Sequence, residues 1–200
     1  MSIRIFSVIG SVNKDSLSEK LNNEVVKLLM KKFPNSTLNQ LNTSNSEFQN
    51  TSLNANNFSE FFTETNSDHW IDILKETNVL VISSPMVNFN YSAGIKNFID
   101  SVAVANKTFS YKYSKKNGSI GLLDNLKVII LGTQGAPESW YPFGNFIENL
   151  RGIFDFFGAN QIETLLVAGN KVEPNSSKTH EQIIDENQSK LIEIVNSINY

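Results

Sequence analysis

The chain has 200 residues and no cysteine, and its 17 basic and 20 acidic side chains give a formal net charge of −3. This length suits a single domain over residues 1–200, and the lack of cysteine excludes disulfides, thiolate metal sites and thiol redox catalysis. Because the lysines are scattered and acidic residues are in excess, we expect no nucleic-acid partner.

The first residues of the chain, Met1 to Lys14, lack the apolar core and the cleavage pattern of a signal peptide. No apolar run is long enough to span a bilayer, so no membrane association is expected. The sequence therefore predicts a cytoplasmic protein.

Apolar periodicity predicts five strands that alternate with helices along the chain. Strands are expected at residues 3–9, 37–41, 79–82, 127–131 and 162–168, and helices at residues 17–33, 70–74, 95–102, 143–157 and 184–198. This alternation is typical of a doubly wound α/β sheet, most simply a flavodoxin-like three-layer sandwich with strand order 2-1-3-4-5 and helices on both faces. The loops after strands one, three and four would then meet at the carboxyl edge, where ligands bind in open α/β sheets.

The turn before the first predicted helix has the features of an anion site. Ser16-Leu17-Ser18-Glu19 fits a capping box, in which Ser16 accepts from the helix amides and Glu19 folds back to the cap. The amides and dipole of a helix start favour phosphate, and the hydroxyls of Ser11, Ser16 and Ser18 would add neutral donors. The alternative is that Ser16 only caps the helix. Without G-K-[ST] or G-x-G-x-x-G, neither a nucleotide triphosphate nor a dinucleotide fold is indicated.

Residues 42–67 form a polar stretch whose few apolar side chains are mostly Phe. We interpret them as an irregular excursion that lies on a surface, either of its own domain or of another subunit. Further along, the loop from Gly132 to Pro137 follows a predicted strand, and its glycines let the backbone approach a ligand closely.

The stretch from Val79 to Val102 changes from apolar strand to polar loop to amphipathic helix. Its strand is expected to be buried on both faces and to stop at Ser83-Ser84-Pro85, because proline cannot donate to a ladder. Residues 86–91 then offer a thioether, two aromatic rings and two amides, which suit the edge and face of a flat heterocycle. The alternative is a strand, a capping loop and a core helix with no ligand.

Other motifs favour no further chemistry. His69 and His180 are far apart in sequence and have no carboxylates at metal-ligand spacing, so no metal site is predicted. The chain lacks G-x-S-x-G, which makes a serine hydrolase a weak hypothesis. Asn117-Gly118, after a lysine-rich segment, predicts a tight turn on an exposed excursion.

The stretch from Val79 to Val102, which contains Pro85-Met86-Val87-Asn88-Phe89-Asn90, resembles the FMN-dependent NADH:azoreductase (NADH:quinone oxidoreductase) family. The loop of that family typically reads P-M-Y-N-F-N before a helix of the L-K-N-x-x-D type. The residues that carry the resemblance are Pro85-Met86-Val87-Asn88-Phe89-Asn90, Ile95-Lys96-Asn97-Phe98-Ile99-Asp100, Lys107-Thr108-Phe109-Ser110-Tyr111, Gly121-Leu122-Leu123 and Phe156-Phe157-Gly158. They follow in order over roughly the whole chain, which is more specific than any single motif. The sequence departs from the family where Val87 replaces the usual Tyr, where Thr133-Gln134-Gly135-Ala136 replaces Ser-Arg-Gly-Gly, and where Ala168-Gly169 lacks an intervening Glu.

The resemblance implies a bound FMN and assigns residues to it. The phosphate would lie at Ser11, Ser16, Leu17 and Ser18; the ring would contact Pro85, Met86, Val87, Asn88 and Phe89; and its polar edge would contact Thr133, Gln134, Gly135 and Ala136. Substrate would stack beside Phe89, with Tyr111 and Phe156 as further walls, although both rings suit a core equally well. No catalytic side chain is required, because the flavin carries the chemistry.

The leading hypothesis is that NADH reduces FMN, leaves, and is replaced in the same pocket by a quinone or azo compound, which gives ping-pong kinetics. The resemblance also implies a homodimer with active sites at the subunit interface, and Tyr111 on the 107–117 excursion is a candidate for completing the partner's pocket. One alternative is a flavodoxin-like FMN electron carrier that serves a protein partner, although such carriers are usually smaller and more acidic. A third is a flavin-free interaction module. The sequence leaves open the physiological acceptor and the choice between NADH and NADPH.

Overall fold

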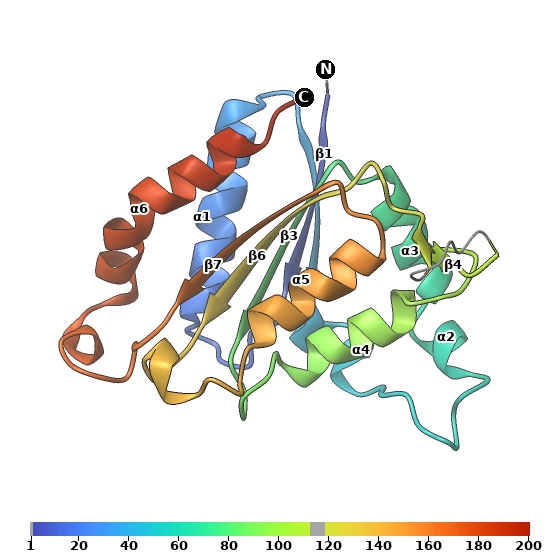
Figure 1. Ribbon diagram of the computed structural model, residues 1–200, viewed down its shortest axis with the longest axis horizontal. Helices are drawn as coiled ribbons and strands as arrows, with labels where there is room; N and C mark the ends of the chain where they lie inside the picture. The colour runs from blue at the N-terminus through green and yellow to red at the C-terminus, as the bar shows by residue number, and fades with distance from the viewer. Residues whose placement is uncertain (1, 113–118) are drawn as a thin grey trace.

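A five-stranded parallel sheet in the order β2-β1-β3-β6-β7 forms the centre of the computed structural model, which describes residues 2–112 and 119–200 (Figure 1). The strands are β1 (Arg4–Ile9), β2 (Thr37–Asn42), β3 (Val79–Pro85), β6 (Lys127–Thr133) and β7 (Gln161–Val167). A separate antiparallel pair consists of β4 (Phe109–Ser110) and β5 (Ile120–Gly121). When this pair is left out of the numbering, the order is 2-1-3-4-5, so the predicted topology is confirmed.

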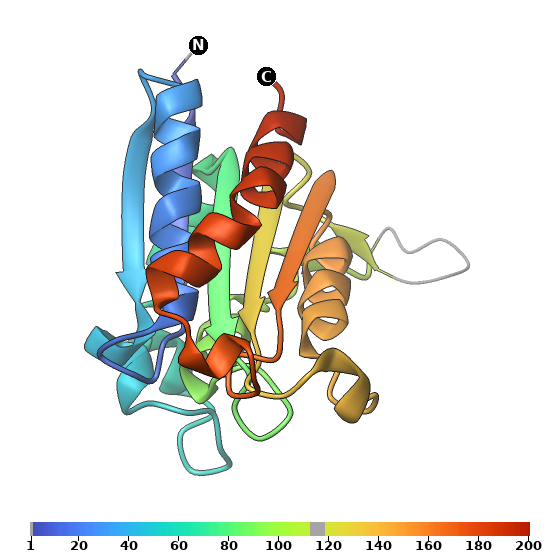
Figure 2. The same cartoon turned by 90° about the vertical axis from the view of Figure 1, so that its left-hand side faces the viewer.

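Helices cover both faces of the sheet. Helices α1 (Leu17–Lys32) and α6 (His180–Ser197) lie on one face, and α3 (Ser67–Glu76), α4 (Ala93–Val102) and α5 (Phe146–Phe156) lie on the other (Figures 1 and 2). The shorter helices are α2 (Phe61–Glu64) and the 3₁₀ turns η1 (Thr43–Asn45), η2 (Glu47–Gln49), η3 (Glu138–Trp140) and η4 (Asn175–Ser177). Within the described residues, no helix combines the length and apolar character needed to cross a bilayer.

The three central strands β1, β3 and β6 are buried on both faces, which explains why they read as continuous apolar runs, whereas the edge strand β2 is largely exposed. In β3, Leu80 and Ile82 enter the core beneath α3, α4 and α5, whereas Val79 and Val81 enter the core beneath α1 and α6. Because side chains alternate along a strand, this one strand contributes to both hydrophobic cores.

Strand β3 is longer than predicted, because Ser83, Ser84 and Pro85 continue it instead of stopping it. Its pairing with β1 ends at Ile9 and Ser83, but its pairing with β6 continues to Pro85. The Met86 amide donates to the Thr133 carbonyl, so the proline nitrogen faces the side where β1 has already ended. Proline is tolerated there because no ladder donor is needed on that side.

Two other expectations need correction. Helix α5 begins at Phe146, not at Phe143, because Asn145 caps it and accepts a bond from the Glu148 amide. The 42–67 excursion is more regular than expected, since it contains η1, η2 and α2. Phe48 and Phe61 of this segment are fully buried in their own chain. The predicted Asn117-Gly118 turn lies outside the described residues.

Candidate functional site

The start of α1 presents hydroxyl and amide donors at the carboxyl edge of the sheet. Ser16 Oγ accepts from the Glu19 amide at 3.3 Å and lies 2.9 Å from Ser18 Oγ. The first intrahelical bond runs from the Lys20 amide to the Ser16 carbonyl at 3.0 Å, which leaves the amides of Leu17 and Ser18 for another acceptor. This helix start therefore offers the donor set that a phosphate requires.

Ser11 shapes the loop that precedes this helix. Its hydroxyl donates to the Asn13 carbonyl at 2.8 Å and accepts from the Asn13 amide at 3.2 Å, and the Ser44 hydroxyl donates to its carbonyl at 2.6 Å. Glu19, expected to complete the capping box, lines the polar cleft beside Ser11 instead. The Ser16 half of the predicted capping box is thus confirmed, and Ser11 uses its hydroxyl to close a turn.

A cluster of charged side chains lies next to the helix start. Lys20 Nζ lies 2.9 Å from carboxylate oxygens of both Asp15 and Glu181, and His180 Nδ1 lies 3.4 Å from Asp15. The hydrogen bond from Lys20 lowers the pKa of the Asp15 carboxyl, and the same contact raises the pKa of Lys20. Asp15 is therefore an anion that shares the Lys20 ammonium with Glu181, so its negative charge next to the helix start is partly offset.

The loop after β3 is a tight turn with unusual backbone angles. The Val87 amide donates to the Asn90 carbonyl at 2.7 Å, and the Asn90 amide donates back at 3.1 Å. Asn88 and Phe89 between them have φ of 46° and 73°. Asn tolerates this left-handed region, but Phe is strained there, and such strain is concentrated at functional sites. The turn holds the Phe89 ring at the surface, with 46% of the residue exposed.

The loop after β6 joins the β3 loop to the chain that follows β7. The Met86 amide donates to the Thr133 carbonyl at 2.7 Å, and the Gln134 amide donates to the Val167 carbonyl at 2.9 Å. The Gln134 side chain is turned into its own loop, where Nε2 donates to the Pro137 carbonyl at 3.1 Å. These bonds hold the two predicted ring-binding loops beside each other.

A cavity of about 490 Å³ opens between these loops, which is within the usual size of a ligand pocket. It is lined by Met86, Asn88, Phe89, Gln134, Gly135, Ala136, Trp140, Tyr141, Lys171 and Val172. The structure therefore brings together six of the predicted site residues in one cavity. Pro85 and Thr133 end the two strands behind it, and Val87 forms the base of the turn.

Sequence reasoning missed four lining residues: Trp140, Tyr141, Lys171 and Val172. The ring of Phe89 lies 5.1 Å from that of Tyr141 and 5.0 Å from that of Phe143, so these side chains form an aromatic wall. The three aromatic residues between Pro137 and Gly144 were the available signal. The 171–172 segment carries no comparable signal, because only the fold brings it to the loop.

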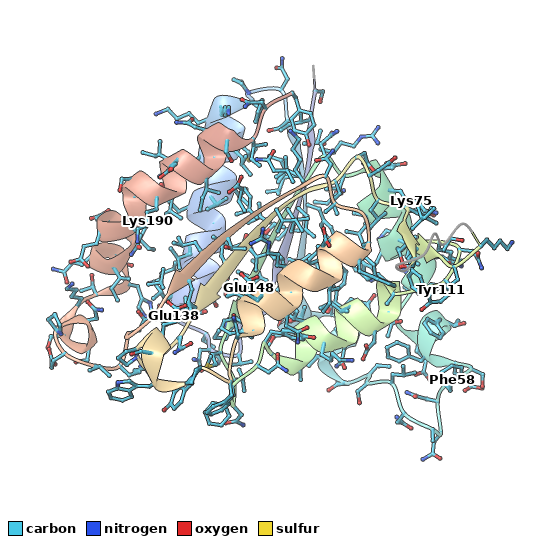
Figure 3. The ribbon with its side chains drawn as sticks, in the orientation of Figure 1. Phe58, Lys75, Tyr111, Glu138, Glu148 and Lys190 are labelled. Atoms are coloured by element: carbon cyan, nitrogen blue, oxygen red, sulfur yellow. The ribbon has the colours of Figure 1, made fainter. Side chains whose placement is uncertain are left out.

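Tyr111 and Phe156, which were predicted as walls of the substrate pocket, do not line this cavity. Both contact Phe109, with ring centroids at 5.3 Å and 4.8 Å. In Figure 3, Tyr111 lies across the molecule from Glu138, the first residue of the η3 turn beside the cavity. A single chain therefore does not bring Tyr111 and Phe156 to Phe89. A pocket formed by all three residues cannot be built within one subunit of this structure.

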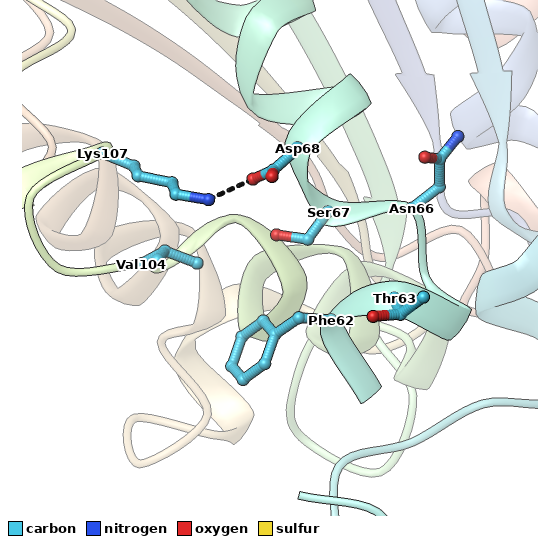
Figure 4. A pocket seen from close by; sticks show the side chains of 7 residues that line it. All are labelled: Phe62, Thr63, Asn66, Ser67, Asp68, Val104 and Lys107. Carbon is cyan, nitrogen blue, oxygen red and sulfur yellow. Dashed lines mark hydrogen bonds and ion pairs between the residues drawn. The ribbon is translucent and has the colours of Figure 1, made fainter. Parts of the chain in front are cut away.

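A second cavity, of about 440 Å³, lies between α2, α3 and the loop after α4 (Figure 4). Lys107 and Asp68 form an ion pair across it, and the Ser67 hydroxyl donates to the Ser101 carbonyl at 2.6 Å. Its two charged side chains are thus paired with each other, and none of the predicted site residues line it. The carboxyl-edge cavity is therefore the candidate site.

Comparisons with known proteins agree with this geometry. Residues 4–194 match the family model described as having a flavodoxin-like fold. The chain is 46% identical over 171 residues to an FMN-dependent NADH:quinone oxidoreductase of Malacoplasma penetrans, covering 86% of this chain and 81% of that protein. It is 43% identical over 171 residues to the protein of the same name from Mycoplasmopsis pulmonis, covering 86% of each.

The fold is also found among solved structures. An azoreductase from Bacillus anthracis superposes with a TM-score of 0.81 at 20% identity, covering 98% of this chain and all of that one. At 20% identity this likeness concerns the fold alone. The two relatives described above are more than 40% identical to this chain, and each match covers most of both sequences. The chain therefore belongs to the flavodoxin-like family and, within it, to the FMN-dependent NADH:quinone oxidoreductases.

Proposed function

We propose that this protein transfers a hydride from NADH to bound FMN and then reduces quinones and azo compounds. The observation that carries the proposal is the cavity between the 86–89 turn and the 134–136 loop, at the edge where α1 begins. The relatives named FMN-dependent NADH:quinone oxidoreductase support the same reaction. The cofactor would supply the redox chemistry, so the chain needs only to bind it, orient it and admit its substrates.

The residues divide into those that hold the phosphate and those that hold the ring. Ser16 and Ser18 would bind the phosphate through their hydroxyls, assisted by the Leu17 and Ser18 amides, and Ser11 would keep the loop in place. Met86, Val87, Asn88 and Phe89 would wrap the ring, with Pro85 fixing the exit of the chain from β3. The backbone of Thr133, Gln134, Gly135 and Ala136 would contact its polar edge.

Phe89 and its aromatic wall would accept the planar substrate. Its ring is exposed and fixed by the strained turn, and Tyr141 and Phe143 support it. A nicotinamide and a quinone are both flat, so the two substrates would use the same open face in turn. Shared use of one face predicts ping-pong kinetics.

An absorbance spectrum of the purified protein, before and after NADH, tests the proposal. We expect protein reconstituted with FMN to retain it on gel filtration, to bleach with NADH alone, and to recover its colour with quinone or azo dye. Initial rates should give parallel double-reciprocal lines. A protein that retains no FMN contradicts the proposal, and a flavin that only another protein can reduce would indicate the electron-carrier alternative.

We also propose a homodimer in which the partner completes each pocket. An apolar groove of about 390 Å³ lies between α4 and α5, and Ile99, Ala103, Gly152 and Phe156 are among its lining residues. Tyr111 is connected to this groove through Phe109, which contacts both Tyr111 and Phe156, and Tyr111 is 65% exposed. A two-fold arrangement through this face would bury the groove and carry Tyr111 and Phe156 to the cavity of the other copy, which a single chain cannot do.

Sedimentation of two variants tests the dimer. A side-chain carbon added at Gly152 meets nothing within 4 Å, so Gly152→Arg should fold normally and yet dissociate the dimer. Tyr111→Ala should keep the dimer and alter substrate kinetics. Phe58→Ala is the matched control, because Phe58 is also 65% exposed but does not line this groove. A Gly152→Arg protein that stays dimeric would remove this face from the interface.

The proposed reaction takes place in the cytoplasm, because its hydride donor, NADH, is an intracellular metabolite. Fractionation of cells followed by an assay for NADH-dependent quinone reduction checks this assignment.

A further inference from the structure

Among the described residues that line the carboxyl-edge cavity, Lys171 alone carries a charge. The chain as a whole has a net charge of −3, so the positive charge at this cavity is opposite in sign to the net charge of the protein. The side chain is exposed, and the cavity on which it borders is the one assigned to the flavin ring.

The backbone holds Lys171 against the ring-binding loop. Its amide donates to the Gly135 carbonyl at 2.9 Å, and the Gly169 amide donates to the Ala136 carbonyl at 2.9 Å. The aliphatic stem of Lys171 covers Gly135, since a side-chain carbon built there would lie 3.1 Å from Lys171 Cγ. The ammonium group is therefore carried on a stem that packs on the centre of the loop.

Gln134 carries no charge, and its side chain is held within its own loop. This residue is only 4% exposed, and its side-chain amide is bonded to the Pro137 carbonyl at 3.1 Å. The family usually has Arg at this point of the loop, and here a neutral side chain folds inward instead. The cation beside the loop comes from the segment that follows β7.

We propose that the Lys171 ammonium stabilises the negative charge that the ring gains on reduction, and thereby raises the reduction potential of bound FMN. The inference rests on the proposed function. Hydride transfer adds two electrons and one proton to a neutral ring and leaves NAD⁺, so the reduced ring carries one additional negative charge. A cation beside the polar edge favours that reduced form over the oxidised one.

Three variants of the FMN-loaded protein test the proposal. Lys171→Met keeps an unbranched stem over Gly135 and removes the charge, whereas Lys171→Arg keeps the charge. Lys190→Met is the matched control, since Lys190 lies on α6 away from the cavity (Figure 3). The reduction potential is measured against a reference dye, and the Kd of oxidised FMN is measured by fluorescence titration of the apoprotein.

We expect Lys171→Met to weaken binding of reduced FMN about tenfold relative to oxidised FMN, which lowers the potential, and high salt should shrink this difference. Lys171→Arg should restore the potential, and Lys190→Met should match the wild type. A wild-type potential in Lys171→Met, or the same loss in Lys171→Arg, would overturn the role of Lys171. Failure of the wild type to bind FMN would instead count against the proposed function.

Discussion

The two edges of the sheet are built differently. At the amino edge, Asn78 ties three parts of the chain together: its side chain accepts from the Arg4 amide at 2.8 Å, and its carbonyl accepts from the Lys127 amide at 2.9 Å and the Tyr200 hydroxyl at 2.5 Å. Asn125 adds bonds to the carbonyls of Lys75 and Thr77. These polar groups are thus satisfied within the chain.

The carboxyl edge keeps its groups available. The amides at the start of α1 precede the first intrahelical bond, Phe89 has a positive φ, and the aromatic side chains of Trp140 and Phe143 are exposed. At one edge the polar groups are joined to one another, whereas the other edge presents amides and aromatic rings to solvent. Substitutions at the amino edge should change stability alone, and those at the carboxyl edge should change FMN retention.

The largest effect is expected beneath the carboxyl edge, at the buried Asn22 of α1. Its amide donates to the Ser83 hydroxyl at 3.1 Å and to carbonyls of β1 and β3, and it accepts from the Ser7 hydroxyl at 2.6 Å. Asn22→Ala should lower the free energy of unfolding by about 3 kcal/mol, because it leaves buried polar groups without their hydrogen-bond partner. Guanidinium unfolding measures this loss. The exposed neighbour Asn23→Ala should change it by less than about 0.5 kcal/mol, and equal effects would refute the buried network.

At the amino edge, Asn125→Ala removes bonds of 3.0 Å and 2.8 Å to the carbonyls of Lys75 and Thr77. We expect the free energy of unfolding to fall by about 1.5 kcal/mol. The Kd for FMN should remain that of the wild type, because no binding loop is touched. A higher Kd for FMN would contradict the view that substitutions at the amino edge change stability alone.

Ser16→Ala and Thr179→Ala form a matched pair of helix caps, since each hydroxyl accepts from an amide three residues later. Both should lose about 1 kcal/mol of folding stability. Only Ser16→Ala should also weaken FMN binding, by about 1 kcal/mol, because it removes a phosphate donor. Isothermal titration with FMN separates the two, and unchanged affinity in Ser16→Ala would leave Ser16 as a cap alone.

The smallest effect concerns pH at the amino edge, because Tyr200 is 47% exposed and solvent screens its charge. Burial raises the pKa of Tyr200 to about 12, above its usual value of 10.0. The folded state therefore holds this proton more tightly, and the resulting stability is complete below pH 10.0 and is lost as the pH rises toward about 12. The stability difference between wild type and Tyr200→Phe should shrink across this window. Unfolding curves at several pH values measure it, and a constant difference would contradict the assignment.

Much of the fold and part of the site could be predicted from local patterns. Strand order was confirmed, as was the Ser16 cap, because alternation of elements and capping residues act over a few residues. The stop at Ser83 was wrong, because the end of a strand depends on whether its neighbours continue, and β6 continues where β1 does not. The distance between Phe89 and Tyr111 likewise follows from no local pattern.

The sequence by itself determined the succession of the strands of the central sheet and their helices, the Ser16 cap at the start of α1 and the residue types around the cavity. Only the tertiary structure decided that Lys171 lies against Gly135, that Tyr141 supports Phe89, and that Phe156 lies elsewhere. Helices, caps and turns arise from neighbours in the chain, whose spacing is visible in the sequence. Contacts between loops depend on the order and register of strands that are far apart in the sequence, so folding must bring them together before they exist.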